Sequence, residues 1–382
     1  MKICHVSTYW PFVDGFTHYT EALMEGLAAH GVGQQIIVAD RRAARKETDL
    51  YSCLPCYMPD EDFVEPIATV VQGVKPDVAI FQYADDVFGM DSRFPRLLAE
   101  LRRSGVKTVV NQHSVYLADQ RCDFHPGGTA ADFDRAVAAE VSRITVHSDR
   151  MRRDLLARGI PEQKIAVVPH GTRITPPLDI PASRRALGLP EPGPVVLFFG
   201  YVWLGKGLDF LLDVFARTRA RVPGAWLYVA GYTRKRSVPG EIYMRYLRAR
   251  MRYLGIRGHT KLSGGYLPEE LVESAFTAAD VVAMPYLQAY SSVSGVVHQA
   301  AGMGRLMLCS DIAKFDEVAA ISPDLVAAPK DVGQWSERLT RLLTDGELAL
   351  QLRAAITRFA EDTRWDVVGR RHLALLEEIC RD

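Results

Sequence analysis

Short apolar runs alternate with amphipathic segments along almost the whole chain of 382 residues. Continuous apolar runs are typical of strands buried on both faces, whereas apolar residues three and four positions apart predict helices. In the first half, strands are predicted at residues 2–7, 35–39, 77–82, 108–112 and 144–147. Helices are predicted at residues 17–30, 64–73, 92–104, 130–141 and 150–158. This alternation favours a parallel, doubly wound sheet.

The pattern restarts after a proline-rich segment at residues 175–194. Further strands are predicted at residues 195–199, 226–230, near Lys261 and at 280–285. Further helices are predicted at residues 208–215, 241–253, 269–278 and 296–303. A chain of this length suits two domains rather than one core. The prediction is an α/β protein with two Rossmann-like, doubly wound domains that face each other across a cleft.

One junction between a predicted strand and a predicted helix has the chemistry of an anion site. Residues 198–209 read FFGYVWLGKGLD, so Lys206 is bracketed by glycines, which are Gly200, Gly205 and Gly207. Glycines allow a tight turn that aims helix-end N–H groups and the lysine ammonium at one phosphate. The spacing is not that of a Walker loop. A packed turn with a solvated lysine is the alternative.

A second junction of this kind follows the strand predicted at residues 280–285. Residues 291–304 read SSVSGVVHQAAGMG. The residues expected at the start of the next helix are Ser291, Ser292, Ser294 and Gly295. Their hydroxyls and free N–H groups would face an anion, and the alternative is a serine-capped helix without a ligand. Because loops after parallel strands share one sheet edge, both junctions are expected in one crevice.

Five segments in this order resemble the GT-B glycosyltransferases of the large retaining family 4, of the group 1 type. They are VVNQHSVY at 109–116, the strand, helix and His-Gly crossover at 143–172, the loop at 198–207, VVHQAAGMGRLMLCSD at 296–311 and TRWDVVGRRHLALLEEI at 363–379. The resemblance implies an acceptor domain at residues 1–172, onto which residues 363–382 cross back. It implies a nucleotide-sugar donor domain at residues 173–362.

The resemblance also implies roles for single residues. Lys206 is expected to be catalytic because it would stabilise the leaving diphosphate. His113 is also expected to be catalytic, because the matching family histidine contacts the transferred sugar. The expected donor-binding residues are Gly15, Gly200, Lys206, Gly207, Gly264, Gly265, Tyr266, Leu267, Ser291, Ser292, Ser294, Gly295, Val296 and Gln299. The expected acceptor-binding residues, in or beside the loop after the first strand, are Trp10, Phe16, His18 and Tyr19. Packing of Trp10 and Tyr19 on the sheet edge is the alternative.

The chain departs from the family pattern at the phosphate site. Tyr201 and Trp203 occupy positions at which family members commonly carry an arginine. Ser291 and Gln299 occupy the positions of the usual pair of glutamates. An amide at Gln299 still hydrogen-bonds ribose hydroxyls, but it supplies no charge. The departures leave the identity of the donor open.

Composition narrows the class of protein. The 46 basic and 46 acidic residues cancel, which disfavours nucleic acid as a partner. No leader or membrane-spanning run is recognised, so we expect a cytoplasmic protein. The six cysteines are scattered and are expected to be reduced, and Cys53 and Cys56 lack a second pair for zinc. The basic segment at residues 244–257 is expected to be solvated or to make weak peripheral contact with an anionic membrane.

No metal site is expected. The pair Asp132 and Asp134 imitates a metal-binding DxD motif but lies within a predicted helix, where a solvated acidic face is expected. The pair Asp85 and Asp86 lies in the first domain, away from the predicted phosphate loops.

The sequence therefore predicts a retaining glycosyltransferase without a cofactor. It would move a hexose-type sugar from a nucleotide diphosphate sugar, UDP- or GDP-linked, to a hydroxyl of a small-molecule, glycan or lipid-linked acceptor. One alternative is a catalytically silent GT-B subunit that binds a nucleotide or a partner. Another is a GT-B nucleotide-sugar epimerase, for which Glu317 is one candidate carboxylate. Oligomeric state stays open.

Overall fold

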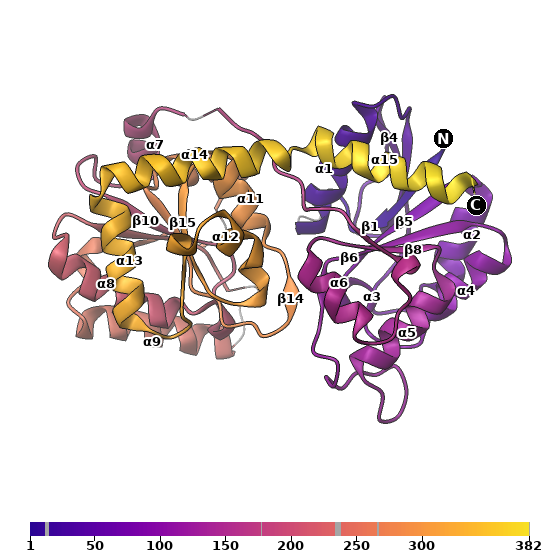
Figure 1. The fold of residues 1–382 in the computed structure, drawn as a ribbon, viewed down its shortest axis with the longest axis horizontal. Coiled ribbons are helices and arrows are strands. Elements are labelled where there is room, and N and C mark those ends of the chain that lie inside the picture. The colour runs from indigo at the N-terminus through magenta and orange to yellow at the C-terminus, as the bar shows by residue number, and fades with distance from the viewer. Residues whose placement is uncertain (12–14, 177, 234–237, 266, 382) are drawn as a thin grey trace. The chain divides into compact units, whose positions relative to one another are not determined.

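The computed structural model describes residues 1–11, 15–176, 178–233, 238–265 and 267–381. They form two compact units, each built on a mainly parallel sheet (Figure 1). The first unit comprises Met1–Gly171, Tyr290–Val293 and Thr363–Asp382, and the second comprises Thr172–Ala289 and Ser294–Asp362. The α/β fold class predicted from the sequence is confirmed.

The first unit has an eight-stranded sheet in the order β3-β4-β2-β1-β5-β6-β8-β9. Every neighbouring pair is parallel except β3 with β4. The strands are β1 (Ile3–Ser7), β2 (Gln35–Asp40), β3 (Lys46–Glu47), β4 (Tyr51–Tyr57), β5 (Val78–Tyr83), β6 (Lys107–Gln112), β8 (Arg143–Val146) and β9 (Ile165–Val167). Side chains of β5 alternate between two cores, with Val78 and Ile80 in one and Ala79 and Phe81 in the other. Both faces of the sheet are therefore covered, as the apolar runs predict.

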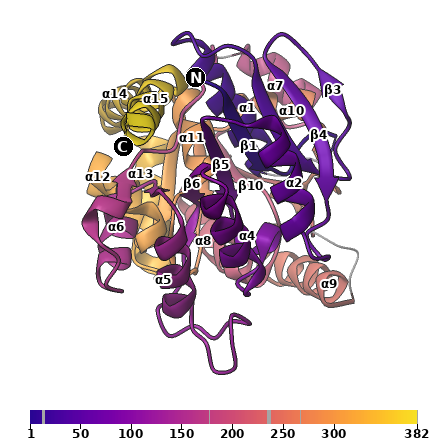
Figure 2. The ribbon, with the colours of Figure 1, turned by 90° about the vertical axis from the view of Figure 1, so that its right-hand side faces the viewer.

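Helices cover these two faces. They are α1 (Gly15–Ala28), α2 (Val64–Val74), α3 (Asp85–Phe88), α4 (Arg93–Arg103), α5 (Ala130–Glu140), α6 (Asp149–Leu156) and α15 (Trp365–Arg381). Helices α2, α4 and α5 contribute to the core around Phe81, whereas α1 and α15 pack around Ile80 (Figures 1 and 2). Helices α1 and α15 approach closely, because a Cβ on Gly369 would lie 2.3 Å from the backbone carbon of Gly26.

The second unit has a fully parallel six-stranded sheet in the order β12-β11-β10-β13-β15-β16. The strands are β10 (Val195–Phe199), β11 (Trp226–Ala230), β12 (Thr260–Leu262), β13 (Val281–Met284), β15 (Leu306–Ser310) and β16 (Val326–Ala327). The helices are α7 (Ile180–Ala186), α8 (Leu208–Arg221), α9 (Val238–Tyr253), α10 (Glu269–Ala278), α11 (Gly295–Gly302), α12 (Asp316–Ile321), α13 (Val332–Thr344) and α14 (Gly346–Asp362). Strand order reverses between β10 and β13, and ligands of such sheets bind beyond the strand ends at that point.

Two parts of the sequence prediction are wrong. Strands β3 and β4 were missed because β4 contains Pro55 and buries mainly alternate residues, so it is not a continuous apolar run. Ser291 and Ser292 do not begin a helix. They form β14 (Ser291–Ser292), which pairs antiparallel with β7 (Ser114–Val115) in the first unit. This pairing uses their backbone groups, so the helix begins only at Gly295.

None of the helices that the structure describes combines the length and apolar character needed to span a bilayer.

Candidate functional site

The glycine-bracketed lysine lies where the sequence predicts it, between a buried strand and a helix. Strand β10 ends at Phe199, and Gly200 follows with a φ of 106°. A short 3-10 turn (Leu204–Lys206) leads to Gly207, whose φ of 66° starts α8. Both glycines adopt backbone conformations that other residues rarely adopt. The loop therefore turns tightly at the carboxyl end of β10.

This loop packs against the loop that follows β13, on the other side of the strand-order reversal. The backbone N–H of Leu287 donates to the Gly205 carbonyl at 2.9 Å. A Cβ on Gly207 would lie 2.1 Å from the Pro285 carbonyl oxygen, so a side chain there would force the two loops apart. The two loops thus fix Lys206 at the edge of the sheet where a ligand is expected.

Lys206 has no anionic partner among the described residues. Its Nζ lies 3.6 Å from the centre of the Tyr286 ring, a cation–π distance. Burial, and secondarily the charge of Lys314, lowers the pKa of Lys206 to about 7. At pH 7 about half of the Lys206 side chains are therefore charged, and the charged form, being partly desolvated, attracts an anion more strongly than a solvated lysine does. The reading of Lys206 as an ordinary solvated lysine is therefore disfavoured.

Helix α11 begins beside an accessible surface. Ser294 precedes the helix in an extended conformation, and its hydroxyl makes no capping hydrogen bond. Gly295 and Gln299 are exposed and Val296 is half-buried, whereas the opposite face of the helix is buried. The first N–H groups of a helix have no partner within it, so they remain available to a ligand. Gly295, Val296 and Gln299 are thus accessible at the start of this helix, whereas Ser294 is buried.

The predicted contacts with the base lie on the loop after β12. Gly264 has a φ of 79°, and no atom lies within 4 Å of a Cβ built on Gly264 or Gly265. Ser263 holds the loop by donating from its hydroxyl to the Gly265 carbonyl at 2.9 Å. Leu267 is buried, and Tyr266 lies outside the described residues. The two glycines thus leave open space at the same edge of the sheet.

Aromatic side chains stand where the family arginines would be. The ring of Tyr201 lies 5.2 Å from that of Tyr232. Trp203 is 46% exposed, and its ring covers Gly205, where a Cβ would lie 2.1 Å from it. Neither residue replaces the lost charge.

In the first unit, His113 belongs to a cluster of histidines at the carboxyl ends of β6, β8 and β9. His113 Nε2 lies 2.9 Å from Gln82 Oε1, and His113 Nδ1 lies 3.1 Å from His147 Nε2. His147 Nδ1 in turn lies 3.1 Å from the Val168 carbonyl. Burial and the neighbouring His147 and His372 hold the pKa of His113 well below its usual range. Both ring nitrogens of His113 are already engaged, which favours positioning over proton transfer.

The sequence interpretation missed His147 and His170. Each follows the end of a strand by one to three residues, as His113 does, and β6, β8 and β9 are neighbours. Three strand-end histidines in successive parallel strands were the available signal. Tyr19 lies among them, with ring centres 4.7 Å from His113 and 5.1 Å from His170.

The residues predicted to bind the acceptor differ in their exposure to solvent. Tyr19 is 3% exposed, so the alternative of packing describes it better than an acceptor contact. Trp10 and His18 remain partly accessible, with ring centres 5.2 Å apart. Phe16 packs on His113 at 5.0 Å. Gly15 does not lie in a loop, because it is the first residue of α1.

The structure describes no cluster of three or more histidines, cysteines or carboxylates that could hold a metal. Asp132 closes a capping box with Thr129 at the start of α5. Asp134 is buried and pairs with Arg158, so the expectation of a solvated acidic face is wrong for it. The Oδ1 atom of Asp134 accepts a hydrogen bond from the side-chain amide of Gln112 at 3.0 Å. Both aspartates therefore have structural partners.

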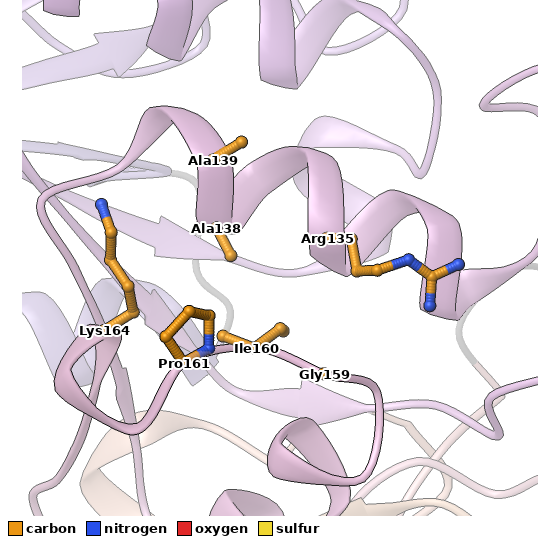
Figure 3. A pocket seen from close by; sticks show the side chains of 7 residues that line it. All are labelled: Arg135, Ala138, Ala139, Gly159, Ile160, Pro161 and Lys164. Carbon is orange, nitrogen blue, oxygen red and sulfur yellow. The ribbon is translucent and has the colours of Figure 1, made fainter.

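A surface hollow of about 290 Å³ lies in the first unit, between α5 and the turn after α6 (Figure 3). It is lined by Arg135, Ala138, Ala139, Gly159, Ile160, Pro161 and Lys164. Its two cations are already engaged, because Arg135 pairs with Asp132 and Lys164 donates to the Val141 carbonyl. No residue of the predicted site lines it.

Comparison with known proteins gives matches in both units. Residues 193–345 match the family model described as glycosyl transferases group 1, and residues 14–171 match the glycosyl transferase 4-like domain.

The chain is also similar to D-inositol 3-phosphate glycosyltransferases. The enzyme from Jonesia denitrificans is 27% identical over 260 residues, which are 64% of this chain and 58% of that protein. The enzyme from Mycobacterium tuberculosis is 29% identical over 222 residues, 55% of this chain and 42% of that protein. The chain thus matches about half the length of these relatives.

Among solved structures, HepE of Anabaena in complex with UDP has a TM-score of 0.76 at 14% identity, and the match covers 99% of this chain and 100% of HepE.

Proposed function

The chain belongs to the GT-B glycosyltransferases, and we propose that it moves a hexose-type sugar from a nucleotide diphosphate sugar to a hydroxyl acceptor. The observation that carries this proposal is Lys206. Its ammonium lies over the Tyr286 ring at the strand-order reversal of the second unit, without an anionic partner among the described residues. Helix α11 begins in the segment that follows β13, the strand that pairs with β10. That arrangement suits the diphosphate of a donor.

In this proposal the second unit stabilises the leaving group. Negative charge builds up on the diphosphate as the bond to the sugar breaks, and a preorganised cation with oriented N–H groups lowers that barrier. Lys206 supplies the charge, and the first turn of α11 supplies the N–H groups. Gln299, exposed one turn further along the helix, would hydrogen-bond the ribose.

The roles in the first unit are proposed from the histidine cluster. His113, fixed by Gln82 and His147, would position the transferred sugar. Trp10 and His18, both partly accessible, would contact the acceptor. We assign the chain to the retaining family 4 within the same proposal, with a donor phosphate oxygen taking the acceptor proton.

A uracil base is the first one to test. HepE, which shares the fold at 14% identity, has been solved with UDP and with UDP-glucose. GDP-linked sugars stay in the screen because Gly264 and Gly265 leave open space where the base would lie. We propose no cofactor beyond the donor.

A donor screen tests this function. Nucleotide sugars are added singly to the protein and the melting temperature is measured, since a ligand at 100 times its dissociation constant stabilises by about 2.7 kcal/mol. At least one nucleotide diphosphate sugar should raise the melting temperature of the wild type, and Lys206→Met should remove this effect. A binding donor is then radiolabelled and offered with sugar, glycan and lipid-linked acceptors. Binding without transfer or donor hydrolysis would instead support a catalytically silent subunit.

An epimerase is not favoured. Glu317 is largely buried and its Oε1 lies 3.4 Å from His298 Nε2. The reported relatives and both family models are glycosyltransferases.

Weak contact with an anionic membrane from the cytoplasmic side belongs to the same proposal. Ile242, Tyr246 and Tyr253 of α9 are 59%, 44% and 86% exposed and lie among arginines. Co-sedimentation with phosphatidylserine vesicles at low salt would detect such contact. Recovery of the protein in the supernatant at every salt concentration would contradict it.

A further inference from the structure

We propose that Lys314 is a second diphosphate-binding cation, which replaces the charge of the arginine that the phosphate loop lacks. The inference deepens the proposed function, since it concerns the donor site of the second unit. Sequence patterns did not single out Lys314, because it lies outside both predicted phosphate loops.

The fold brings Lys314 to the edge of the sheet that holds Lys206. Lys314 lies in the 3-10 turn Ala313–Phe315, which begins three residues after the end of β15. Strand β15 pairs with β13, and β13 pairs with β10. All three strands are parallel, so the segments that follow them lie at one edge.

One aromatic contact links the two segments that carry the lysines. Lys206 lies over the Tyr286 ring, and the Tyr286 ring is centred 5.3 Å from that of Phe315, the neighbour of Lys314. Lys314 is close enough for its charge to lower the pKa of Lys206. The segments that carry the two lysines therefore meet at Tyr286.

Lys314 is 9% exposed. Burial lowers its pKa to about 8, although the nearby Glu317 acts in the opposite direction. Two partly desolvated cations that repel each other destabilise the folded chain, and such arrangements are typical of binding sites for the opposite charge.

Two buried hydroxyls on these segments lack a hydrogen-bond partner among the described residues. The Tyr286 hydroxyl and the Ser310 hydroxyl, the latter at the end of β15, make no hydrogen bond to a described residue. Buried polar groups are nearly always hydrogen-bonded, so unsatisfied hydroxyls beside two cations indicate a place that a polar ligand completes.

Charge matching then favours a diphosphate. The diphosphate diester of a nucleotide sugar carries two negative charges, and Lys206 alone neutralises one. Tyr201 and Trp203, at the arginine positions, neutralise none. Lys314 supplies a second positive charge from the turn after β15, although Glu317 nearby offsets part of it.

The test uses isothermal titration calorimetry with inorganic pyrophosphate and with UDP. Lys314→Met should weaken the binding of both probes roughly ten- to hundredfold, the usual effect of losing a hydrogen bond to a charged group. Lys314→Arg should recover part of this loss. Lys330→Met, which removes an exposed lysine on the loop after β16, is the matched control and should bind like the wild type. Thermal melts verify that each variant is folded.

A second variant separates diphosphate binding from a structural ion pair. Under the proposal Glu317→Gln leaves the affinity for pyrophosphate unchanged or raises it, because an acidic neighbour of Lys314 is removed. If Lys314 served only to neutralise Glu317, Lys314→Met would lower the melting temperature and leave both affinities within twofold of wild type. That result would overturn the inference.

The outcomes also separate this inference from the proposed function. UDP binding that Lys206→Met abolishes and Lys314→Met does not change would overturn only the role of Lys314. Pyrophosphate binding that needs both lysines, in a protein that binds no nucleotide sugar, would support the inference and overturn the proposed function. If the wild type bound neither pyrophosphate nor UDP, both would be wrong.

Discussion

Donor binding should become weaker as pH rises from 6 to 8, because Lys206 loses its proton in the free protein. Burial and Lys314 lower the pKa of Lys206 to about 7. Bound diphosphate would restore a high pKa, so only the free protein loses the charge across this range. The charged fraction of Lys206 falls from about 0.9 at pH 6 to about 0.09 at pH 8. The dissociation constant should therefore rise roughly tenfold.

The assay is calorimetry with the nucleotide sugar that the donor screen identifies. Its diphosphate is a diester and does not titrate near neutral pH, so the ligand charge stays constant. At pH 8, titrations in buffers with different ionisation enthalpies should reveal uptake of about 0.9 proton per donor bound. Lys206→Arg is the matched control, since arginine stays charged throughout this range, and its affinity should not change with pH. A wild-type affinity that is constant from pH 6 to 8, without proton uptake, would refute the reasoning.

Further predictions concern stability, the ribose, metals and packing. The desolvated charge of Lys206 opposes folding below pH 7 and ceases to do so as pH rises toward the pKa of an unfolded lysine. Lys206→Met should thus raise the melting temperature at pH 6 by about 2–8 °C, and this gain should vanish near pH 10. Scanning calorimetry of the variant and the wild type at both pH values measures the difference. In steady-state kinetics, Gln299→Ala should raise the donor KM more than it lowers kcat, and Gln299→Glu should keep kinetics close to those of the wild type. Unchanged kinetics for the alanine variant would exclude the ribose contact. Transfer should survive excess EDTA and respond little to Mn²⁺, and activity restored by a divalent ion after EDTA would contradict this. Gly369→Ala should lower the free energy of unfolding, measured by urea denaturation, by about 1–3 kcal/mol, because the added Cβ would meet the backbone of Gly26. Gly73→Ala in α2, where no atom lies within 4 Å of the added Cβ, should leave this free energy unchanged or raise it.

The parallel elements of the fold were predictable because each leaves a local signal. Continuous apolar runs placed β10, β11 and β5 to within a residue or two, and spaced apolar residues placed α10. Strand β4 was not predictable in this way, since Pro55 interrupts it and its buried residues mainly alternate. The pairing of Ser291 with Val115 was also hidden, because nothing near Ser291 in the sequence indicates its partner.

The candidate site shows the same division between local and long-range information. Gly200, Lys206 and Gly207 were recognisable because the motif is contiguous, and Gly200 and Gly207 occupy positive-φ positions at which glycine is the usual residue. Lys314 was missed because its relation to Lys206 depends on the order β10-β13-β15, which single segments do not reveal. Asp134 was misread because its partner, Arg158, comes from another helix end.

The most direct test of the central claim is the release of nucleoside diphosphate from a bound donor. The wild type is incubated with the radiolabelled nucleotide sugar selected by the donor screen, together with the acceptor panel. We expect labelled acceptor, or at least slow donor hydrolysis, with an equivalent amount of nucleoside diphosphate. We also expect near-complete loss of this release in Lys206→Met, with wild-type activity in Lys330→Met. Binding of the donor with no release under any condition, or full activity in Lys206→Met, would contradict the account.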